Sequence, residues 1–195
     1  MSVSDQANNT REKLLNTALT LIKEEGFEAV TIRRIAGLSG TNISLVNYYF
    51  GSKEGMISNA IQRLLDGFRG SFAVLDDKSL PAKERLKQFL ADYANKVSEY
   101  PELVTKMIVL GNASYESQRK YGEFLRDSGF IKACGILLEI TSEHDPKRLM
   151  MMLMQLFGAV FLPMLMKPLI ASGTGYDPAS AQVQMDLLFE RYFQE

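Results

Sequence analysis

Apolar residues recur at helical spacing along most of the chain, and few stretches alternate with the two-residue period of a strand. The clearest signals for helix starts and turns lie in residues 31–53. Thr31 and Asn42 carry side-chain oxygens suited to capping a helix N-terminus. Gly40, between them, can adopt the positive φ that reverses the chain. The pattern predicts two short helices separated by a glycine turn, the second over residues 43–50, followed at once by a third helix.

The second short helix is predicted to have two unlike faces. At about 100° per residue, Val46 and Phe50 point to one side as a core face. Helix, glycine turn and helix is the helix-turn-helix signature, in which the second helix enters the DNA major groove. Amide side chains can hydrogen-bond to adenine there, and hydroxyl side chains can hydrogen-bond to bases of either strand. The residues predicted to face away from the core are Ile43, Ser44, Asn47 and Tyr48.

Charge in this segment suits a polyanion. Residues 29–53 contain the cations Arg33, Arg34 and Lys53 and no carboxylate. Lysine and tyrosine side chains commonly contact phosphates. The pattern alone leaves one alternative open, a small helical hairpin whose polar face is simply solvated.

Residues 10–60 resemble the DNA-binding domain of the TetR family of bacterial transcriptional regulators. The first helix matches the family's pattern of an arginine, an aliphatic pair, an alanine, two further apolar positions and Gly-Phe before a threonine. The glycine turn, the aromatic pair before a phenylalanine and the Ser-Lys-Glu start of the third helix match as well. The matching residues are Arg11, Leu14, Leu15, Ala18, Leu21, Ile22, Gly26, Phe27, Thr31, Ile35, Ala36, Gly40, Val46, Tyr48, Tyr49, Phe50, Ser52, Lys53 and Glu54.

The resemblance implies which residues contact DNA. Those expected to face bases are Ile43, Ser44, Leu45 and Asn47, and those expected to face phosphates are Thr31, Tyr48, Tyr49 and Lys53. We count Arg33 and Asn42 as DNA-binding candidates too.

The chain departs from the family's pattern mainly on the reading helix. The family usually has tyrosine at the position of Asn47, and small or polar residues at Ile43 and Leu45. The usual Ala-Gly-Val turn is Ser-Gly-Thr over residues 39–41. Gly55 replaces a common glutamate and is expected to loosen the first turn of its helix. The operator sequence therefore stays open.

Beyond residue 67 the chain is predicted to continue as helices. Pro81 opens one with Leu86, Phe89, Leu90, Tyr93 and Val97 on its apolar stripe, and residues 103–111 form another. A long helix is predicted over residues 116–143, with Tyr121, Phe124, Leu125, Ile131, Cys134 and Leu138 inward. The Asp-Pro pairs at 145–146 and 177–178 signal the starts of the last two helices.

Residues 149–166 are apolar except for Gln155, at the lower edge of a membrane span's length. Pro163 interrupts them, and a helix apolar on all sides can equally be buried. We expect one face in the chain's own core and the other against a second subunit, in the four-helix bundle that the resemblance implies for the dimer. The interface candidates are Met152, Leu156, Val160, Met185, Leu188 and Tyr192.

The second half is rich in Met and aromatic residues, which either form ordinary core or line an adaptable cavity. The resemblance implies a small-molecule cavity among the middle helices, and we expect an apolar or amphipathic effector. The ligand-binding candidates are Phe89, Tyr93, Met107, Leu110, Tyr115, Phe124, Gln155 and Phe157.

Composition narrows the class of protein. The formal net charge is −1, which favours a local basic patch over non-specific nucleic-acid binding. The single cysteine, Cys134, excludes an internal disulfide framework and suits a reducing cytoplasm. We expect neither enzyme activity nor any cofactor or metal, because no Cys/His cluster or Gly-rich phosphate loop occurs, and His144 lies in a predicted turn.

These inferences combine into one prediction. The fold is all-α: a flexible tail (1–9), a three-helix helix-turn-helix DNA-binding domain (10–66) and a larger helical effector-binding and dimerisation domain (67–195). The protein is predicted to be a cytoplasmic, ligand-responsive repressor that binds a palindromic double-stranded operator as a homodimer and is not a membrane protein. The alternative is a membrane-associated or small-molecule-binding helical protein that does not bind DNA.

Overall fold

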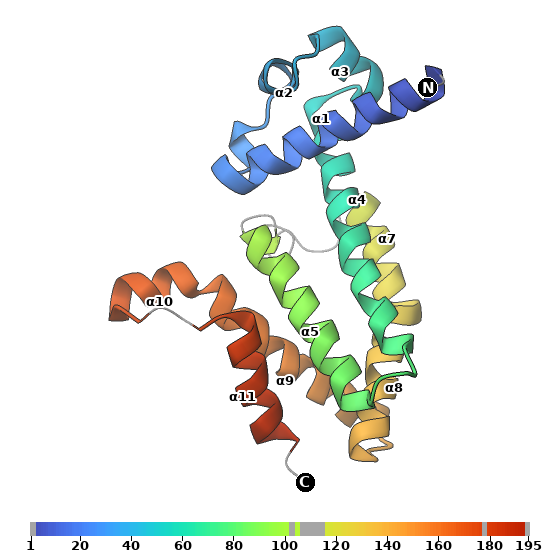
Figure 1. Cartoon of the computed structure of the whole chain (residues 1–195), viewed down its shortest axis with the longest axis vertical. Helices are drawn as coiled ribbons and strands as arrows, with labels where there is room; N and C mark the ends of the chain where they lie inside the picture. The colour runs from blue at the N-terminus through green and yellow to red at the C-terminus, as the bar shows by residue number, and fades with distance from the viewer. Residues whose placement is uncertain (1–2, 102–103, 106–115, 177–178, 194–195) are drawn as a thin grey trace. The chain divides into compact units, whose positions relative to one another are not determined.

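The described part of the chain is helical and contains no strand, which confirms the predicted all-α class (Figure 1). The computed structural model describes residues 3–101, 104–105, 116–176 and 179–193. Its residues group into two compact units, one of residues 1–66 with 102–120 and one of residues 67–101 with 121–195. The predicted domains differ from these units because they assigned residues 102–120 to the second domain. Most of that segment, including the predicted helix over 103–111, lies outside the described residues.

The first unit packs its helices around one apolar core. Its elements are α1 (Val3–Glu25), a 3-10 turn η1 (Phe27–Ala29), α2 (Ile32–Ser39), α3 (Ile43–Phe50) and α4 (Lys53–Ser71) as far as residue 66. Every helix contributes to the core, whose fully enclosed residues include Leu14, Ala18, Ile35, Val46, Met56 and Ala60.

Helix α1 is longer than predicted, because it begins at Val3 and not after a tail of nine residues. Residues 3–9 contain neither glycine nor proline, and Asp5 lies in the first turn, where a negative charge favours the helix dipole. Farther along, Arg11 ties α1 to the rest of the unit. Its Nη2 donates to Asn59 Oδ1 at 2.5 Å, and its guanidinium lies 5.7 Å from the centroid of the Phe50 ring.

The second unit contains the last residues of α4 and all later elements except the segment 102–120. These elements are the 3-10 turn η2 (Phe72–Asp76), α5 (Ala82–Glu99), the end of α7 (Glu116–Phe124), the π-helical turn η4 (Leu125–Gly129), α8 (Phe130–Thr141), α9 (Pro146–Leu165), α10 (Lys167–Thr174) and α11 (Ala181–Tyr192). Its core includes Leu86, Phe89, Leu90, Leu137, Leu153, Leu156 and Met185.

The predicted helix starts hold where the structure describes them. Pro81 precedes the first residue of α5, and the Asp145 side chain accepts from the Lys147 backbone N–H at 2.9 Å to cap α9. The last helix differs slightly, since Ser180 caps it and its first residue is Ala181. The predicted start signal at residues 177–178 lies outside the described part. Helix α10 was not predicted.

The predicted long helix over 116–143 is divided by the π-helical turn η4. A π turn accommodates one residue more than an α turn, so it changes which side chains point inward in the helix that follows. Ile131, predicted inward, is therefore 65% exposed, and Cys134 and Leu138 are only partly buried. The buried positions are Gly129, Ala133, Ile136 and Leu137.

Helix α9 is long and apolar enough to cross a membrane, judged by length and composition alone. The core helix of a soluble protein passes the same test. Leu149, Leu153, Leu156 and Val160 recur at helical spacing and are buried inside the second unit. One stripe of α9 is thus an ordinary core face, as predicted.

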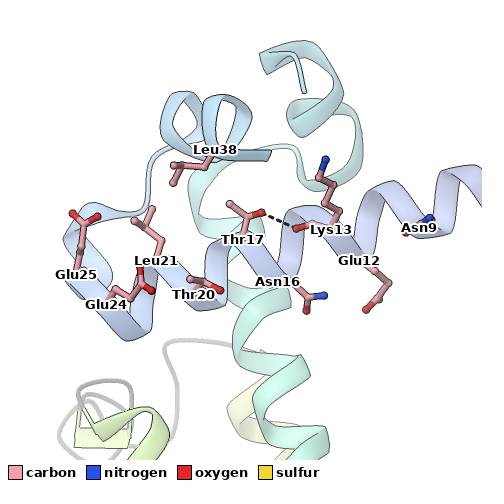
Figure 2. Close-up of a pocket in the computed structure, with 10 residues that line it drawn as sticks. All are labelled: Asn9, Glu12, Lys13, Asn16, Thr17, Thr20, Leu21, Glu24, Glu25 and Leu38. Carbon is pink, nitrogen blue, oxygen red and sulfur yellow. Dashed lines mark hydrogen bonds between the residues drawn. The ribbon is translucent and has the colours of Figure 1, made fainter. Parts of the chain in front are cut away.

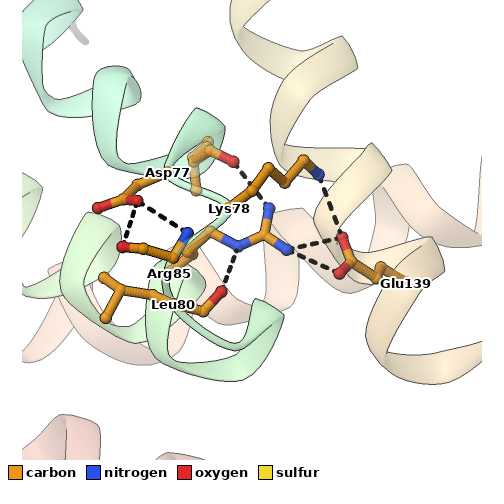
Figure 3. A network of polar contacts seen from close by, with 7 residues as sticks. Asp77, Lys78, Leu80, Arg85 and Glu139 are labelled. Carbon is orange, nitrogen blue, oxygen red and sulfur yellow. Dashed lines mark hydrogen bonds and ion pairs between the residues drawn. The ribbon is translucent and has the colours of Figure 1, made fainter.

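A buried arginine joins three segments of the second unit (Figure 3). Arg85 of α5 is 1% exposed, and its guanidinium donates to the Leu75 carbonyl at 2.9 Å and the Leu80 carbonyl at 3.1 Å. Its Nη2 also contacts both carboxylate oxygens of Glu139 in α8, at 2.7 and 2.8 Å. Hydrogen bonding from Arg85 lowers the pKa of Glu139. This network could not be predicted from the sequence, because an isolated arginine in an amphipathic helix is usually exposed.

Candidate functional site

The helix-turn-helix has the local geometry that the sequence predicts. The Thr31 hydroxyl accepts from the Arg34 backbone N–H at 3.2 Å and caps α2. Gly40 ends α2 with φ of 63°, a left-handed conformation that favours glycine. The Asn42 side chain then accepts from the Leu45 N–H at 2.7 Å and caps α3. The predicted bounds of α3, residues 43–50, are confirmed.

Helix α3 has the two faces that the sequence predicts. Val46 is fully buried and Phe50 is 7% exposed, so they hold the helix against the core. On the opposite side Tyr48 is 81% exposed and Ile43 44% exposed. Ser44 and Asn47 are also exposed, and Leu45 is half-buried. The outward side of α3 therefore offers an amide, a hydroxyl and a phenol to a partner.

The remaining DNA-binding candidates surround this face. Tyr49 is half-buried, and its ring makes a T-shaped contact with Tyr48 at 5.2 Å between centroids. Arg33 is exposed near the start of α2, and Lys53, half-buried, is the first residue of α4. The oxygens of Thr31 and Asn42 are occupied as helix caps. These two residues therefore position the helices in addition to any contact they make with a partner.

One of the three cations in this region is neutralised within the unit. Arg34 makes two hydrogen bonds with the Glu25 carboxylate, at 2.6 and 2.9 Å. The hydrogen bond from Arg34 lowers the pKa of Glu25, so the pair stays charged and mutually compensated at neutral pH. Arg33 and Lys53 therefore carry more of the local positive potential than Arg34 does.

The turn between α2 and α3 contains a polar contact that the sequence analysis missed. Ser39 is 1% exposed, and its hydroxyl donates to the Ile35 carbonyl at 2.6 Å. It also lies 2.9 Å from the Thr41 hydroxyl. This pair links the end of α2 to the residue after Gly40. The sequence does offer a signal for this contact: Ser39 and Thr41 flank the turn, and small hydroxyl side chains often bond to nearby backbone.

Leu38 of α2 is apolar but 62% exposed. It borders an open groove of about 590 Å³, lined otherwise by α1 residues between Asn9 and Glu25 (Figure 2). Most of these are polar, and Glu12, Glu24 and Glu25 give the groove an acidic lining. No residue of α3 lines this groove, so it is separate from the predicted DNA-reading face.

Gly55 has a role that the sequence analysis did not anticipate. The first turn of α4 is capped by Ser52, whose side-chain oxygen accepts from the Gly55 N–H at 3.1 Å. A Cβ built on Gly55 would lie 2.1 Å from the Phe50 carbonyl oxygen. The close approach of the end of α3 to α4 therefore requires glycine here.

Four of the predicted ligand-binding residues meet in an aromatic cluster of the second unit. Phe89 lies 5.7 Å from Tyr93 and 6.1 Å from Phe157, measured between ring centroids. Phe124 joins through Phe72, at 5.2 Å. We call the contacting set the aromatic cluster; it consists of Phe68, Phe72, Phe89, Tyr93, Tyr121, Phe124, Phe157 and Phe161.

The other ligand-binding candidates are not part of this cluster. Gln155 is exposed on α9, where its side-chain oxygen accepts from the Tyr192 hydroxyl at 2.7 Å. Gln155 therefore lies apart from the other candidates that the structure describes. Met107, Leu110 and Tyr115 lie outside the described residues.

Three predicted interface residues are wrong. Leu156 and Met185 have no exposed surface and Val160 is 1% exposed, so they cannot contact a second chain. A helix that is apolar all round has no polar face to fix its orientation, so the sequence could not select the outward side. Met152 and Leu188 are half-buried against the core, and Tyr192 is 38% exposed. The exposed apolar residues of α9 and α11 are Met151, Met154, Leu162, Val183 and Leu187.

Little in the described residues suggests catalysis. No group of three or more His, Cys, Asp or Glu side chains could hold a metal ion in that part of the chain. His144 is exposed in the turn before α9, where its backbone N–H donates to Glu143. Burial raises the pKa of the Cys134 thiol, which disfavours the reactive thiolate.

Comparison with known sequences points to one family. Residues 14–60 match the family described as "Bacterial regulatory proteins, tetR family". The HTH-type transcriptional repressor NicS of Pseudomonas putida is 28% identical over 102 residues, which cover 52% of this chain and 48% of NicS. The chain thus matches about half the length of such curated relatives. These relatives are transcriptional regulators and not enzymes.

Solved structures extend the likeness to the whole fold. A transcriptional regulator of the TetR/AcrR family from Thermobifida fusca aligns with a TM-score of 0.70 at 18% identity, covering 96% of this chain and 100% of that one. A regulator from Saccharomonospora viridis, solved in complex with choline, aligns with a TM-score of 0.69 at 18% identity, covering 96% and 99%. At such identities the likeness concerns the fold alone.

Proposed function

Because the chain belongs to the TetR family of bacterial regulatory proteins, we propose that it is a transcriptional repressor that binds a palindromic operator as a homodimer in the cytoplasm. A small apolar or amphipathic effector, bound in the second unit, releases it from DNA. The observation that carries the DNA-binding part is the exposed outward face of α3, which presents Ser44, Asn47 and Tyr48 while Val46 and Phe50 fix the helix to the core.

The chemistry of this face suits the major groove. Asn47 can make two hydrogen bonds to an adenine edge, and the Ile43 side chain can contact a thymine methyl group. Tyr48, Arg33 and Lys53 can contact phosphates, which position a protein on the duplex without selecting sequence. One short helix reads only a few base pairs. Two copies about 34–36 Å apart, related by two-fold symmetry, would give useful specificity.

Asn47→Ala tests the assignment of the reading face. We expect it to weaken binding to the cognate site by about 1–3 kcal/mol and to leave binding to scrambled DNA nearly unchanged, because a base contact is lost. Lys53→Gln is the matched control, expected to weaken both DNAs alike and to reduce the salt dependence. Fluorescence anisotropy titrations with both duplexes measure the ratio. An unchanged ratio in Asn47→Ala would remove this residue from the reading face.

The second copy is proposed to dock on the exposed apolar residues of α9 and α11. These helices expose Met151, Met154 and Leu162 on one and Val183 and Leu187 on the other, all within the second unit. Large apolar side chains gathered on an exposed surface are typical of interaction sites in soluble proteins. Two helices from each chain would form a four-helix bundle.

Leu187→Glu tests this interface. Leu187 is 53% exposed, so the substitution should leave the fold intact and shift the protein to monomer by placing an unpaired charge between two chains. Ile131→Glu is the control, because Ile131 is 65% exposed on α8, outside the proposed face. Light scattering should give a dimer for the wild type and for Ile131→Glu. A dimer of Leu187→Glu that is as stable as the wild type would exclude this face.

Release from DNA requires an effector that distinguishes two conformations. It must bind the released conformer more tightly than the DNA-bound one, since a ligand with equal affinity for both shifts nothing. Helix α4 supports a route for this coupling, because it starts next to α3 and its last residues contribute Phe68 to the aromatic cluster. An effector that moves those rings would act directly on α4.

A further inference from the structure

The aromatic cluster contains two phenol groups that contact each other, one on the buried Tyr121 and one on the half-buried Tyr93. The Tyr93 hydroxyl on α5 lies 2.7 Å from the Tyr121 hydroxyl on α7. Tyr121 is 7% exposed, and the Tyr93 ring lies 4.6 Å from Phe68 and 5.3 Å from Phe161, between centroids. The two hydroxyls are thus surrounded mainly by apolar rings.

One hydrogen bond cannot satisfy both groups. Each phenol carries one hydrogen and can also accept, so one tyrosine donates to the other and the acceptor keeps its own hydrogen. Among the described residues, no carbonyl, carboxylate or amide oxygen accepts that second hydrogen. A donor left without an acceptor beside apolar rings costs free energy, more so at Tyr121, which is buried, than at Tyr93, which is half-buried. The pair therefore suits a partner that supplies an acceptor.

The surroundings indicate the charge of that partner. Burial raises the pKa of Tyr93 to about 12 and also raises the pKa of Tyr121, so both phenols stay neutral donors at physiological pH. The Arg69 guanidinium lies 5.0 Å from the centroid of the Phe124 ring, the neighbour of Tyr121 in the cluster. Coulombic interaction with Arg69 works against the rise in the pKa of Tyr121, so the positive charge of Arg69 acts at that hydroxyl and disfavours a cationic ligand there. Apolar rings elsewhere disfavour a full negative charge on the ligand body.

The segment directly after α7 has a backbone feature that is common at functional sites. The π-helical turn η4 begins directly after Phe124, and single π turns within helices occur frequently at functional sites. At its end, a Cβ built on Gly129 would lie 3.1 Å from the Phe72 ring. Glycine therefore lets this ring of the cluster approach the backbone of the turn.

We propose that the Tyr93–Tyr121 hydroxyl pair is the polar anchor of the effector site, and that the effector is an uncharged molecule with an apolar body and a carbonyl oxygen. The oxygen accepts the second phenolic hydrogen, and the body displaces or spreads the rings of the aromatic cluster. This inference rests on the proposed function, because it specifies the ligand class of the same effector site.

The test uses two probes of nearly equal shape, acetophenone and ethylbenzene, with the full-length protein and without DNA. We expect acetophenone to bind about ten-fold more tightly by calorimetry, as one net hydrogen bond predicts. The carbonyl carbon of ¹³C-labelled acetophenone should shift downfield when bound. Tyr93→Phe combined with Tyr121→Phe should abolish both the preference and the shift.

The double variant should fold, because removing both partners of a buried hydrogen bond is nearly neutral for stability. Tyr176→Phe is the control, since Tyr176 is 61% exposed and outside the cluster; it should retain the preference. Equal affinity for the two probes, no binding of acetophenone up to its solubility limit, or a preference that survives in the double variant would each overturn the proposal. DNA retardation by the same samples, measured separately, reports on the proposed function itself.

Discussion

Gly55→Ala is expected to destabilise the first unit by about 1–3 kcal/mol and to weaken DNA binding, because the added methyl group overpacks a tight contact. Its Cβ would lie 2.1 Å from the Phe50 carbonyl oxygen, and this neighbour is backbone that cannot rotate away. The end of α3 and the start of α4 would have to separate. Since Phe50 holds α3 to the core, the separation would also tilt the reading face.

Gly37→Ala provides the matched control for this substitution. Gly37 lies within α2, and a Cβ built there has no neighbour within 4 Å. Alanine should therefore stabilise the helix by about 0.5–1 kcal/mol, because glycine has the greater conformational entropy in the unfolded chain. Chemical denaturation followed by circular dichroism measures both changes. A Gly55→Ala protein as stable as the wild type would show that the contact between α3 and α4 is looser than described.

Arg85→Met is expected to destabilise the second unit by about 2–4 kcal/mol, because the buried Leu75 carbonyl, the part-buried Leu80 carbonyl and a carboxylate lose a shared donor. Methionine fills much of the same volume, so the effect reports on polar contacts more than on a cavity. Arg126→Met is the control: Arg126 is 71% exposed and pairs only with the neighbouring Asp127 among the contacts described for its side chain. It should change stability by less than about 0.5 kcal/mol.

The Arg85 network also predicts a dependence on pH. Because Arg85 lowers the pKa of Glu139 in the folded state, the pair stabilises the fold above the pKa of an unfolded glutamate. This contribution is lost as the pH falls through the lowered folded-state pKa. The thermal unfolding midpoint of the wild type should therefore fall more steeply on acidification than that of Arg85→Met. Parallel pH profiles for the two proteins would contradict the role assigned to the pair.

The sequence predicted structure well where polar and apolar residues contrast. The caps Thr31 and Asn42 and the two faces of α3 could be read from residue types, because capping and helical periodicity are local. The same is true of Asp145 before α9. These features set the bounds and the orientation of the candidate DNA-reading helix.

The structure could not be predicted from the sequence where the deciding interaction is non-local, or where polar and apolar residues do not contrast. The residue types near positions 125–129 do not predict a π turn. The wrong side of α8 was therefore predicted to face the core, and Ile131 was predicted to be buried. Helix α9 is apolar on all sides, and Leu156 was assigned to an interface although it lies in the core. Arg85 and Tyr93 contact Glu139 and Tyr121, which lie far from them in sequence. Arg11 and Asn59 are likewise far apart in sequence.

Retardation of the DNA upstream of this chain's own gene tests the central claim most directly. In low-salt buffer we expect the purified protein to retard that fragment as two chains per site, in competition with excess scrambled DNA. Asn47→Ala combined with Ser44→Ala should lose this selectivity while remaining folded and dimeric. If the wild type failed to retard the fragment, or if the double variant retained full selectivity, the outward face of α3 would not be the surface that reads an operator.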